Sequence, residues 1–230
     1  MKKIGLLGGM SWESSLEYYR IINEEVKKKM GGTHSARCHL NSLDFGEIEI
    51  LQHQNEWEKL TKLMVFEATK LKTAGADFIV ICTNTMHKMA AEIEETTGLH
   101  VLHIADTTGD AIKQAGLDTI GLLGTRFTME GDFYKKRLND TFGIKTLIPE
   151  KNDRKIIHEV IYKELVKGIL KEDSRLQYLE IIDKLRIEGA QGVILGCTEI
   201  PLLIKQDRSP LPIFDTTTIH AKAAVKYALM

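Results

Sequence analysis

The sequence predicts an α/β fold built from two pseudo-symmetric α/β/α half-domains with mainly parallel sheets. One observation behind this prediction is that short apolar runs alternate with longer amphipathic ones along the chain. The other is an internal repeat, because three segments recur in the same order in the two halves. Two similar halves can reach both faces of one small ligand, so we expect the active site in the cleft between them.

The repeat consists of three matched pairs of segments. The pairs are IGLLGGMS (4–11) with IGLLGTRFT (120–128), GADFIVICTNT (75–85) with GAQGVILGCTE (189–199), and HIADTT (103–108) with PIFDTT (212–217). Aligning the second pair on its Gly-Ala start places Thr83 opposite Cys197. The two copies therefore differ at one chemically important position.

Apolar patterning gives the elements in order. We expect strands at Lys3–Leu7, Arg37–Leu43, Phe78–Cys82 and Val101–Ile104 in the first half of the chain, and at Thr119–Leu123, Lys145–Ile148, Val193–Gly196 and Pro212–Phe214 in the second. Helices are expected where apolar residues recur three or four positions apart, at Leu16, Tyr19, Ile22, Val26 and Met30, at Trp57, Leu60, Met64, Ala68 and Leu71, and over Arg154–Lys167, Ser174–Glu188 and Thr217–Leu229. Helical crossovers between parallel strands follow from this order.

No low-complexity or Pro/Gly-rich linker separates the halves, which indicates that they pack together. We expect the chain to cross between them near Gly98–His103 and Asp207–Pro212. One half-domain is then 1–99 plus 210–230, and the other is 100–209.

Composition excludes several classes of protein. The 230 residues carry a formal net charge of −1, which gives no nucleic-acid footprint and no reason to bind an anionic membrane. The apolar start is short, so it is interpreted as a strand rather than a signal peptide. Three cysteines without a CxxC motif fit a reduced, cytoplasmic protein.

Four polar loops follow predicted strands, and ligands of open parallel sheets bind beyond the carboxyl ends of strands. The loops are Gly8–Ser11, Thr83–Thr85, Gly124–Thr125 and Cys197–Glu199. Met10 and Ser11 lie in the first, which is not a GxGxxG dinucleotide motif and which is equally explained as a tight turn capped by Ser11. Asn84 and Thr85 suit a carboxylate or an amino group, although such residues also cap helices.

Cys197 is the candidate best suited to a catalytic role. It follows an apolar strand and precedes a predicted helix, whose N-terminus would lower the pKa of the thiol. An inert core cysteine is the common alternative, but the repeat favours function. Cys82 points to the opposite side of its strand from Thr83, so we interpret it as a core thiol.

The remaining candidates are weaker. His87 lies one helical turn beyond Asn84 and is expected to brace the Thr83 loop. Residues 46–58 are polar and could form a mobile lid, with Gln52 as a ligand contact. His34, Cys38 and His39 do not match a zinc spacing, so no metal site is predicted.

At these residues the chain resembles the aspartate/glutamate racemase family. IGLLGGMSWES, CTNTMHK, LLGTRFTM and LGCTEIPLL all look like that family's motifs, and the resemblance covers essentially the whole chain. It implies two pseudo-symmetric α/β halves, a homodimer, and racemisation of a small amino-acid substrate without pyridoxal phosphate or metal. In the family two Cys residues flank the α-carbon and move protons on opposite faces.

The resemblance assigns roles to residues. Cys197 matches the second catalytic Cys, and Thr83 stands where the first Cys usually stands. Asn84, Thr85, Thr125 and Thr198 match positions that hold the α-carboxylate and α-amino group, and Met10 and Ser11 match the first loop of the cleft. Val166 replaces a Lys that many aspartate racemases have, which loosens the expectation for the substrate side chain.

The sequence therefore predicts an isomerase that converts L-aspartate and L-glutamate to the D-amino acids. Cys197 would remove the α-proton, and Thr83 would assist reprotonation. A broad-specificity amino-acid racemase is the nearest alternative. A non-catalytic binder of dicarboxylates or amino acids is a second one, since the first Cys is lost.

Overall fold

The computed structural model describes residues 1–230, which form two compact units. Unit 1 comprises Met1–Ile104 and His220–Met230, and unit 2 comprises Ala105–Ile219. These bounds lie later in the chain than the sequence-based ones at 99 and 210. Two strand pairings account for the difference. Val101 bridges to Ile79 in unit 1, and the strand that begins at Ile213 pairs within unit 2.

Seven strands form two parallel sheets, one in each unit. They are β1 (Ile4–Gly8), β2 (Cys38–Ser42), β3 (Phe78–Ile81), β4 (Thr119–Gly124), β5 (Lys145–Leu147), β6 (Val193–Gly196) and β7 (Ile213–Asp215). The first sheet has the order β2-β1-β3 and the second β5-β4-β6-β7. Every pairing is parallel, so the predicted α/β class is confirmed.

The helices connect these strands. They are α1 (Trp12–Met30), α2 (Phe45–His53), α3 (Trp57–Thr73), α4 (Ala90–Thr97), α5 (Ile104–Gln114), α6 (Arg126–Glu130), α7 (Asp132–Phe142), α8 (Lys151–Lys163), α9 (Glu172–Ile187), α10 (Ile200–Leu203) and α11 (Thr216–Ala228). Two 3₁₀ turns, η1 (Thr85–Met89) and η2 (Leu165–Lys167), complete the set.

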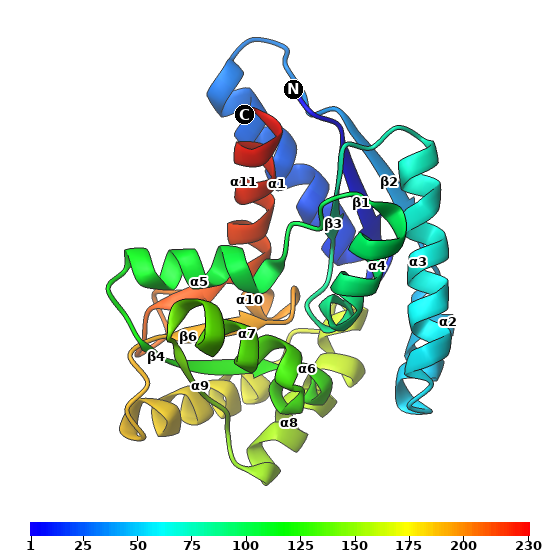
Figure 1. The fold of residues 1–230 in the computed structure, drawn as a ribbon. Coiled ribbons are helices and arrows are strands. Elements are labelled where there is room, and N and C mark those ends of the chain that lie inside the picture. Colours follow the sequence, from blue (N-terminus) through cyan, green and yellow to red (C-terminus); the bar gives the residue numbers. More distant parts are fainter. The chain divides into compact units, whose positions relative to one another are not determined.

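Unit 1 has helices on both faces of its sheet (Figure 1). On one face Leu6 and Val80 pack against α1 and the later part of α11, through Tyr18 and Val225 among others. On the other face α2, α3 and α4 cover Leu7, Ile79 and Ile81. Alternate residues of one strand thus enter different cores, as the two-residue period of a strand requires.

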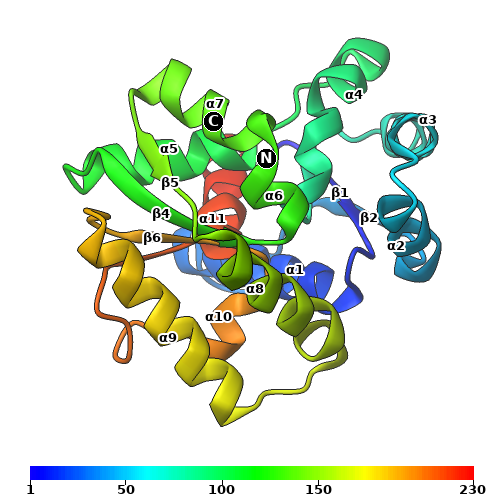
Figure 2. The ribbon, with the colours of Figure 1, turned by 90° about the horizontal axis from the view of Figure 1, so that it is seen from below.

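In unit 2, α5 and α7 lie on one side of the sheet, while α8 and α9 lie on the other (Figure 2). The hydroxyl of Tyr134 on α7 donates to Thr108 Oγ1 on α5 across 3.4 Å. On the opposite side, the Tyr178 hydroxyl on α9 donates to the Ile157 carbonyl on α8 across 3.0 Å. This unit therefore repeats the layered plan of unit 1.

The two sheets share one pairing register. In unit 1 Leu7 pairs with Ile81, and in unit 2 Leu123 pairs with Leu195. The edge strands β2 and β5 also take equivalent places beside β1 and β4. The first two repeated segments are therefore repeated in three dimensions within each unit.

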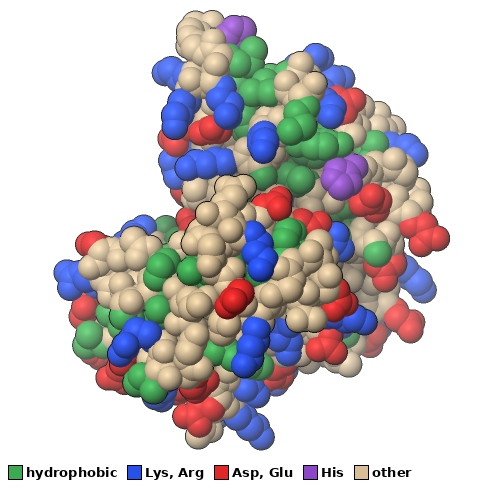
Figure 3. Space-filling view, turned by 60° about the vertical axis from the view of Figure 1, so that its left-hand side comes forward, with side chains coloured by type: hydrophobic (Ala, Val, Ile, Leu, Met, Phe, Trp, Pro, Cys, Tyr) green, Lys and Arg blue, Asp and Glu red, His purple; other side chains and the backbone are tan.

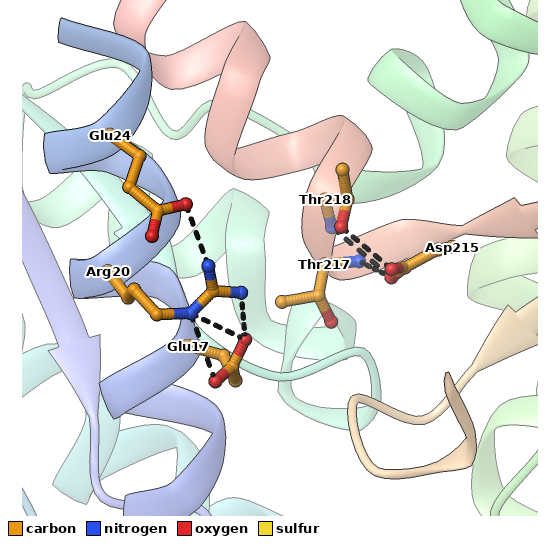
Figure 4. A network of polar contacts seen from close by, with 6 residues as sticks. All are labelled: Glu17, Arg20, Glu24, Asp215, Thr217 and Thr218. Atoms are coloured by element: carbon orange, nitrogen blue, oxygen red, sulfur yellow. Dashed lines mark hydrogen bonds and ion pairs between the residues drawn. The ribbon is translucent and has the colours of Figure 1, made fainter. Parts of the chain in front are cut away.

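For the third pair of segments, the alignment of the sequence motifs differs from the alignment in the structure. The isolated bridge of Val101 to Ile79 corresponds to the pairing of Ile213 with Val193 in β7. This correspondence places His103 opposite Asp215, whereas the HIADTT and PIFDTT motifs place it opposite Pro212. Asp215 caps α11 by accepting bonds from the backbone N–H groups of Thr217 and Thr218, as Figure 4 shows.

Two local predictions need correction. Val101–Ile104 was expected to be a strand, but it forms only the single bridge, because α5 already begins at Ile104. The polar segment 46–58 is no loop. It holds α2, whose Ile48 and Gln52 are buried.

Helix α1 is confirmed, but the residues that it buries differ from the apolar set that predicts it. Leu16 is 53% exposed and Tyr19 is 48% exposed, while Ser14, Ser15 and Tyr18 are buried. The exposed side of α1 also carries Arg20 between Glu17 and Glu24 (Figure 4). Hydrogen bonds to Glu17 and then Glu24 hold the pKa of Arg20 above its ordinary value, although exposed pairs add little to stability.

Basic and acidic side chains are interspersed on the face that Figure 3 shows, with apolar groups between them. Such mixing matches the balanced composition and offers no broad field for a polyanion. None of the helices has both the length and the apolar character that crossing a membrane requires.

Gly9 provides a test of how closely the β1–α1 loop approaches β2. A Cβ on Gly9 would overlap the Leu43 backbone, and its φ is +85°, whereas Gly31 has a φ of +73° with nothing within 4 Å. Gly31→Ala should cost about 1–3 kcal/mol of unfolding free energy, because its φ of +73° with a ψ of −175° lies in a region that only glycine enters readily. Gly9→Ala should cost about 2 kcal/mol more. Urea unfolding checks this, and equal losses would contradict the close approach.

Candidate functional site

In unit 1 the first candidate loop is held by three serines. Ser11 is the N-cap of α1 and accepts from the Ser14 backbone N–H across 3.4 Å. Ser15 Oγ accepts from the Gly9 N–H at 2.7 Å and donates to the Ser11 carbonyl at 3.1 Å. The expected cap thus exists, and Met10 and Ser11 are both buried.

The second candidate loop of unit 1 lies against the first. Ser14 Oγ donates to the carbonyl of Cys82 at 2.7 Å, directly before Thr83. Thr83 is partly exposed, whereas Asn84 and Thr85 are buried. Asn84 occupies the N-cap position of η1, but its side chain makes no capping bond. Helix capping therefore does not account for the amide at this position.

Gln52 and Cys82 occupy buried positions beside this loop. Gln52 Nε2 donates to Met86 Sδ at 3.3 Å, so α2 brings Gln52 against η1. The Cys82 side chain is fully buried in the core, and burial raises the pKa of its thiol. The interpretation of Cys82 as a core thiol agrees with this environment.

His87 makes the bracing contact that its spacing predicts. Its Nδ1 lies 2.7 Å from the Thr83 carbonyl oxygen. The ring is buried, and burial followed by the nearby His103 and His220 lowers the pKa of His87 well below its ordinary value. A neutral imidazole therefore donates to the loop that carries Thr83.

In unit 2, Thr125 and Cys197 follow neighbouring strands. The last pair between β4 and β6 is Gly124 with Gly196, and each candidate is the next residue. A Cβ on Gly124 would lie 2.8 Å from the Gly196 carbonyl oxygen. Glycine at this position therefore lets the two strand ends approach closely. The Thr125 hydroxyl caps α6 by accepting from the Thr128 N–H.

Cys197 is bonded to a carboxylate that the sequence analysis did not select. Its Sγ donates to Glu199 Oε2 at 2.9 Å, and Thr198 Oγ1 donates to the same oxygen at 2.8 Å. Glu199 is 3% exposed. A buried carboxylate so close to a thiol has a direct electrostatic effect on its ionisation.

The expected lowering of the Cys197 pKa is wrong. Burial, and then the charge of Glu199 and its hydrogen bond with the thiol, raise the pKa well above its ordinary value. Helix α10 has only four residues, so its N-terminus offers little to oppose these effects. The Cys197 thiol is consequently protonated at neutral pH.

Two further residues were missed by sequence reasoning. Glu199 was visible in the LGCTEIPLL motif, but only the fold reveals that its carboxylate returns to Cys197. Thr217 lies in the second DTT motif, and its hydroxyl is buried without a hydrogen-bond partner (Figure 4). An unsatisfied buried hydroxyl is costly, so Thr217 joins the candidate polar contacts.

The structure contains no group of three or more His, Cys, Asp or Glu side chains suited to holding a metal ion. Val166 stands where many aspartate racemases have a Lys, and it lies in η2. No basic side chain takes part in the described contacts of Cys197. Its thiol bonds to Glu199, and burial and the Glu199 carboxylate raise its pKa by more than the backbone N–H groups of Glu199 and Thr198 lower it.

Comparison with known proteins identifies the family and the fold. The family described as Asp/Glu/Hydantoin racemase matches residues 7–224. The chain belongs to this racemase family. The resemblance seen in the motifs is therefore confirmed, and the protein is an enzyme of the amino-acid racemase type.

Several relatives of this racemase span its whole length. A structure from Yersinia pestis, assigned as an Asp/Glu racemase, is 53% identical, with 100% of both chains covered and a TM-score of 0.93. An aspartate racemase homologue from Pyrococcus horikoshii OT3 is 32% identical, also over 100% of both chains, with a TM-score of 0.85. The broad specificity amino-acid racemase RacX of Bacillus subtilis is 23% identical over 96% of each chain.

Glu199→Gln tests the electrostatic coupling at Cys197 of the racemase. Loss of the carboxylate charge should lower the pKa of the thiol, so alkylation by iodoacetamide at pH 8 should accelerate roughly tenfold or more. The measurement uses a Cys38→Ser background, because Cys38 is only half-buried. Glu188→Gln, on an exposed residue, is the control. An unchanged rate in Glu199→Gln would contradict the coupling.

Proposed function

We propose that this racemase converts L-aspartate and L-glutamate to their D-forms without a cofactor. Cys197 takes the α-proton from one face of the α-carbon, and the Thr83 side returns a proton to the other face. The protein acts on a free amino acid. We further propose that it works in the cytoplasm as a homodimer, without pyridoxal phosphate or metal, and with no nucleic-acid or membrane partner.

One observation carries this proposal. Ile81 and Leu195 occupy equivalent places in the two sheets, beside Leu7 and Leu123 respectively. Thr83 and Cys197 each stand two residues beyond these pairs. Racemisation removes a proton from one face of the α-carbon and returns one to the other face. Proton-transferring groups at equivalent strand ends of a pseudo-symmetric protein are the arrangement that this reaction requires.

Polar groups at the same strand ends would hold the substrate. Asn84, Thr85, Thr125 and Thr198 are proposed to bind the α-carboxylate and α-amino group. All four are buried, and hydroxyls and amides fixed in a water-poor site stabilise the enolate-like charge that develops on the α-carboxylate. Met10, Ser11 and Gln52 would contact the remainder of the substrate.

The protonated state of Cys197 requires a proton acceptor before the thiol can act as a base. Glu199 is suited to this role, since its Oε2 already accepts from Sγ. Transfer of the thiol proton to Glu199 leaves a thiolate beside a neutral carboxylic acid. The thiolate then takes the α-proton, and the C–H electron pair remains on the substrate as an enolate. Glu199 afterwards releases its proton to solvent.

The opposite face has different chemistry. A threonine hydroxyl is a poor base, but it can donate a proton or relay one through water to the carbanion. Solvent then reprotonates Thr83, which balances the proton released by Glu199. Because enantiomers have an equilibrium constant of one in water, kcat/KM must be equal in both directions. The asymmetry can appear only as different kcat and KM values for the two enantiomers.

A broader substrate range is the second candidate. The similarity to RacX over 96% of both chains favours it, as does Val166 in place of the Lys that would clamp a side-chain carboxylate. Incubation with a panel of L-amino acids, followed by chiral chromatography, separates the two candidates. Conversion confined to aspartate and glutamate supports the narrower function.

Cys197→Ser tests the proposed base. Exchange of the α-hydrogen of L-aspartate and L-glutamate with D₂O should fall by about 100-fold or more, because a serine hydroxyl cannot replace a thiolate. Proton NMR of the substrate measures the exchange, and Cys38→Ser is the matched control. Wild-type exchange in Cys197→Ser would remove this residue from the mechanism.

Thr83→Val tests the opposite face, because it removes the hydroxyl and keeps a similar shape. Formation of D-product should fall by about 100-fold, while α-hydrogen exchange of the L-substrate continues at Cys197. Thr83→Cys should preserve or raise D-to-L turnover, since a thiol can both give and take the proton. Polarimetry from each enantiomer measures this. A large fall in a correctly folded Thr83→Cys would argue against proton transfer here.

A further inference from the structure

Three buried histidines form one cluster in unit 1. The ring centroids of His87 and His103 are 4.8 Å apart, and those of His87 and His220 are 5.5 Å apart. All three side chains are nearly or fully buried. Tyr18 of α1 extends the cluster, because its ring meets His220 edge-on with centroids 5.6 Å apart.

Hydrogen bonds fix the tautomers of two of these rings. A backbone carbonyl can only accept, so His87 must carry its proton on Nδ1, which lies 2.7 Å from the Thr83 carbonyl. His220 must carry its proton on Nε2, which lies 2.7 Å from the Leu102 carbonyl. With the proton on Nε2, Nδ1 of His220 is left to accept from the Tyr18 hydroxyl, which lies 2.8 Å away.

The cluster also lies where the chain leaves and re-enters unit 1. His103 immediately precedes Ile104, the last residue of the first segment of unit 1, and His220 is the first residue of the returning segment. The bond from His220 to Leu102 ties these two crossings together. His87, in contact with both His103 and His220, connects them with the loop that carries Thr83.

We propose that His87 is a positioning residue for the Thr83 side of the reaction, held by His103 and His220 so that its Nδ1–H fixes the Thr83 carbonyl. The inference rests on the proposed function, because it specifies how that function's proton-donating side is aligned. His87 does not itself exchange protons with the substrate. Its one N–H, at Nδ1, is bonded to the Thr83 carbonyl.

Two physical facts support positioning over acid–base chemistry. The pKa of His87 is lowered well below its ordinary value by burial, and further by the electrostatic effect that a proton on His87 would meet from His103 and His220, so the ring stays neutral at working pH. A neutral imidazole keeps a single donor, and the Thr83 carbonyl uses it. The Thr83 main chain is otherwise followed only by a short 3₁₀ turn, which is a weak constraint on its direction.

The experiment compares His87→Leu with His87→Asn. Leucine fills much of the space and has no donor, whereas the amide nitrogen of asparagine lies near the position of Nδ1. His34→Leu removes an exposed histidine and serves as the control. Each variant is assayed in D₂O for two rates with the L-substrate, namely α-hydrogen exchange and formation of D-product.

In His87→Leu, kcat for D-product should fall roughly 10- to 100-fold, the range expected when a reacting group is displaced by about 1 Å. Cys197 is not displaced in this variant, so α-hydrogen exchange at its face should stay within about twofold of the wild-type rate. The ratio of the exchange rate to the racemisation rate should therefore rise. His87→Asn should restore most of the lost kcat. Equal falls in both rates, or no rescue by asparagine, would overturn the positioning role.

The wild-type enzyme supplies a second measurement that does not depend on a folded variant. Long-range ¹H–¹⁵N NMR of the histidine rings should show His87 as the Nδ1–H tautomer and His220 as the Nε2–H tautomer between pH 6 and pH 8. An Nε2–H tautomer of His87, or its titration in this range, would contradict the proposal. A wild-type enzyme with neither exchange nor racemisation would instead refute the proposed function and leave the tautomer test intact.

Discussion

The parallel pairing of the first strand of each unit with its third strand is the constraint on which the site depends. β1 with β3, and β4 with β6, end in the same register, and parallel strands place the loops that follow them at one edge of the sheet. The loops therefore meet in pairs. In unit 1, Ser14 of the first loop bonds to the Cys82 carbonyl directly before Thr83, and in unit 2, Thr125 and Cys197 follow the paired Gly124 and Gly196. Small residues permit this approach, since Gly124 and Gly196 lie backbone to backbone.

The two strand ends then create different chemical surroundings. In unit 2 the thiol is buried beside a carboxylate, which favours the protonated form and couples its ionisation to Glu199. In unit 1 the corresponding position carries a partly exposed hydroxyl whose backbone is held by a neutral histidine. Pseudo-symmetry in the backbone is thus combined with asymmetry in acidity. The proposed proton transfer on two unlike faces of the substrate needs both.

Much of the fold could be read from the sequence. Strand β6 lies at its predicted residues, β3 and β4 differ from prediction by one residue at one end, and β1 by one residue at each end. These strands were predictable because buried parallel strands are short, uninterrupted apolar runs. The helix α2 was missed, since Gln52 and the charged residues around it resemble a solvated loop. Its burial comes from the contact of Gln52 and Ile48 with neighbouring elements, which no local pattern records.

The sequence by itself determined the α/β class, the internal repeat and the opposition of Thr83 to Cys197, because these follow from the order of residues along the chain. It misplaced the third repeat, since the DTT motif caps α11 in one copy and lies inside α5 in the other. Only the tertiary structure decided the ionisation of Cys197 and the tautomer of His87. Those properties depend on burial and on contacts that folding sets, with the Glu199 carboxylate for the thiol and the Thr83 carbonyl for the imidazole.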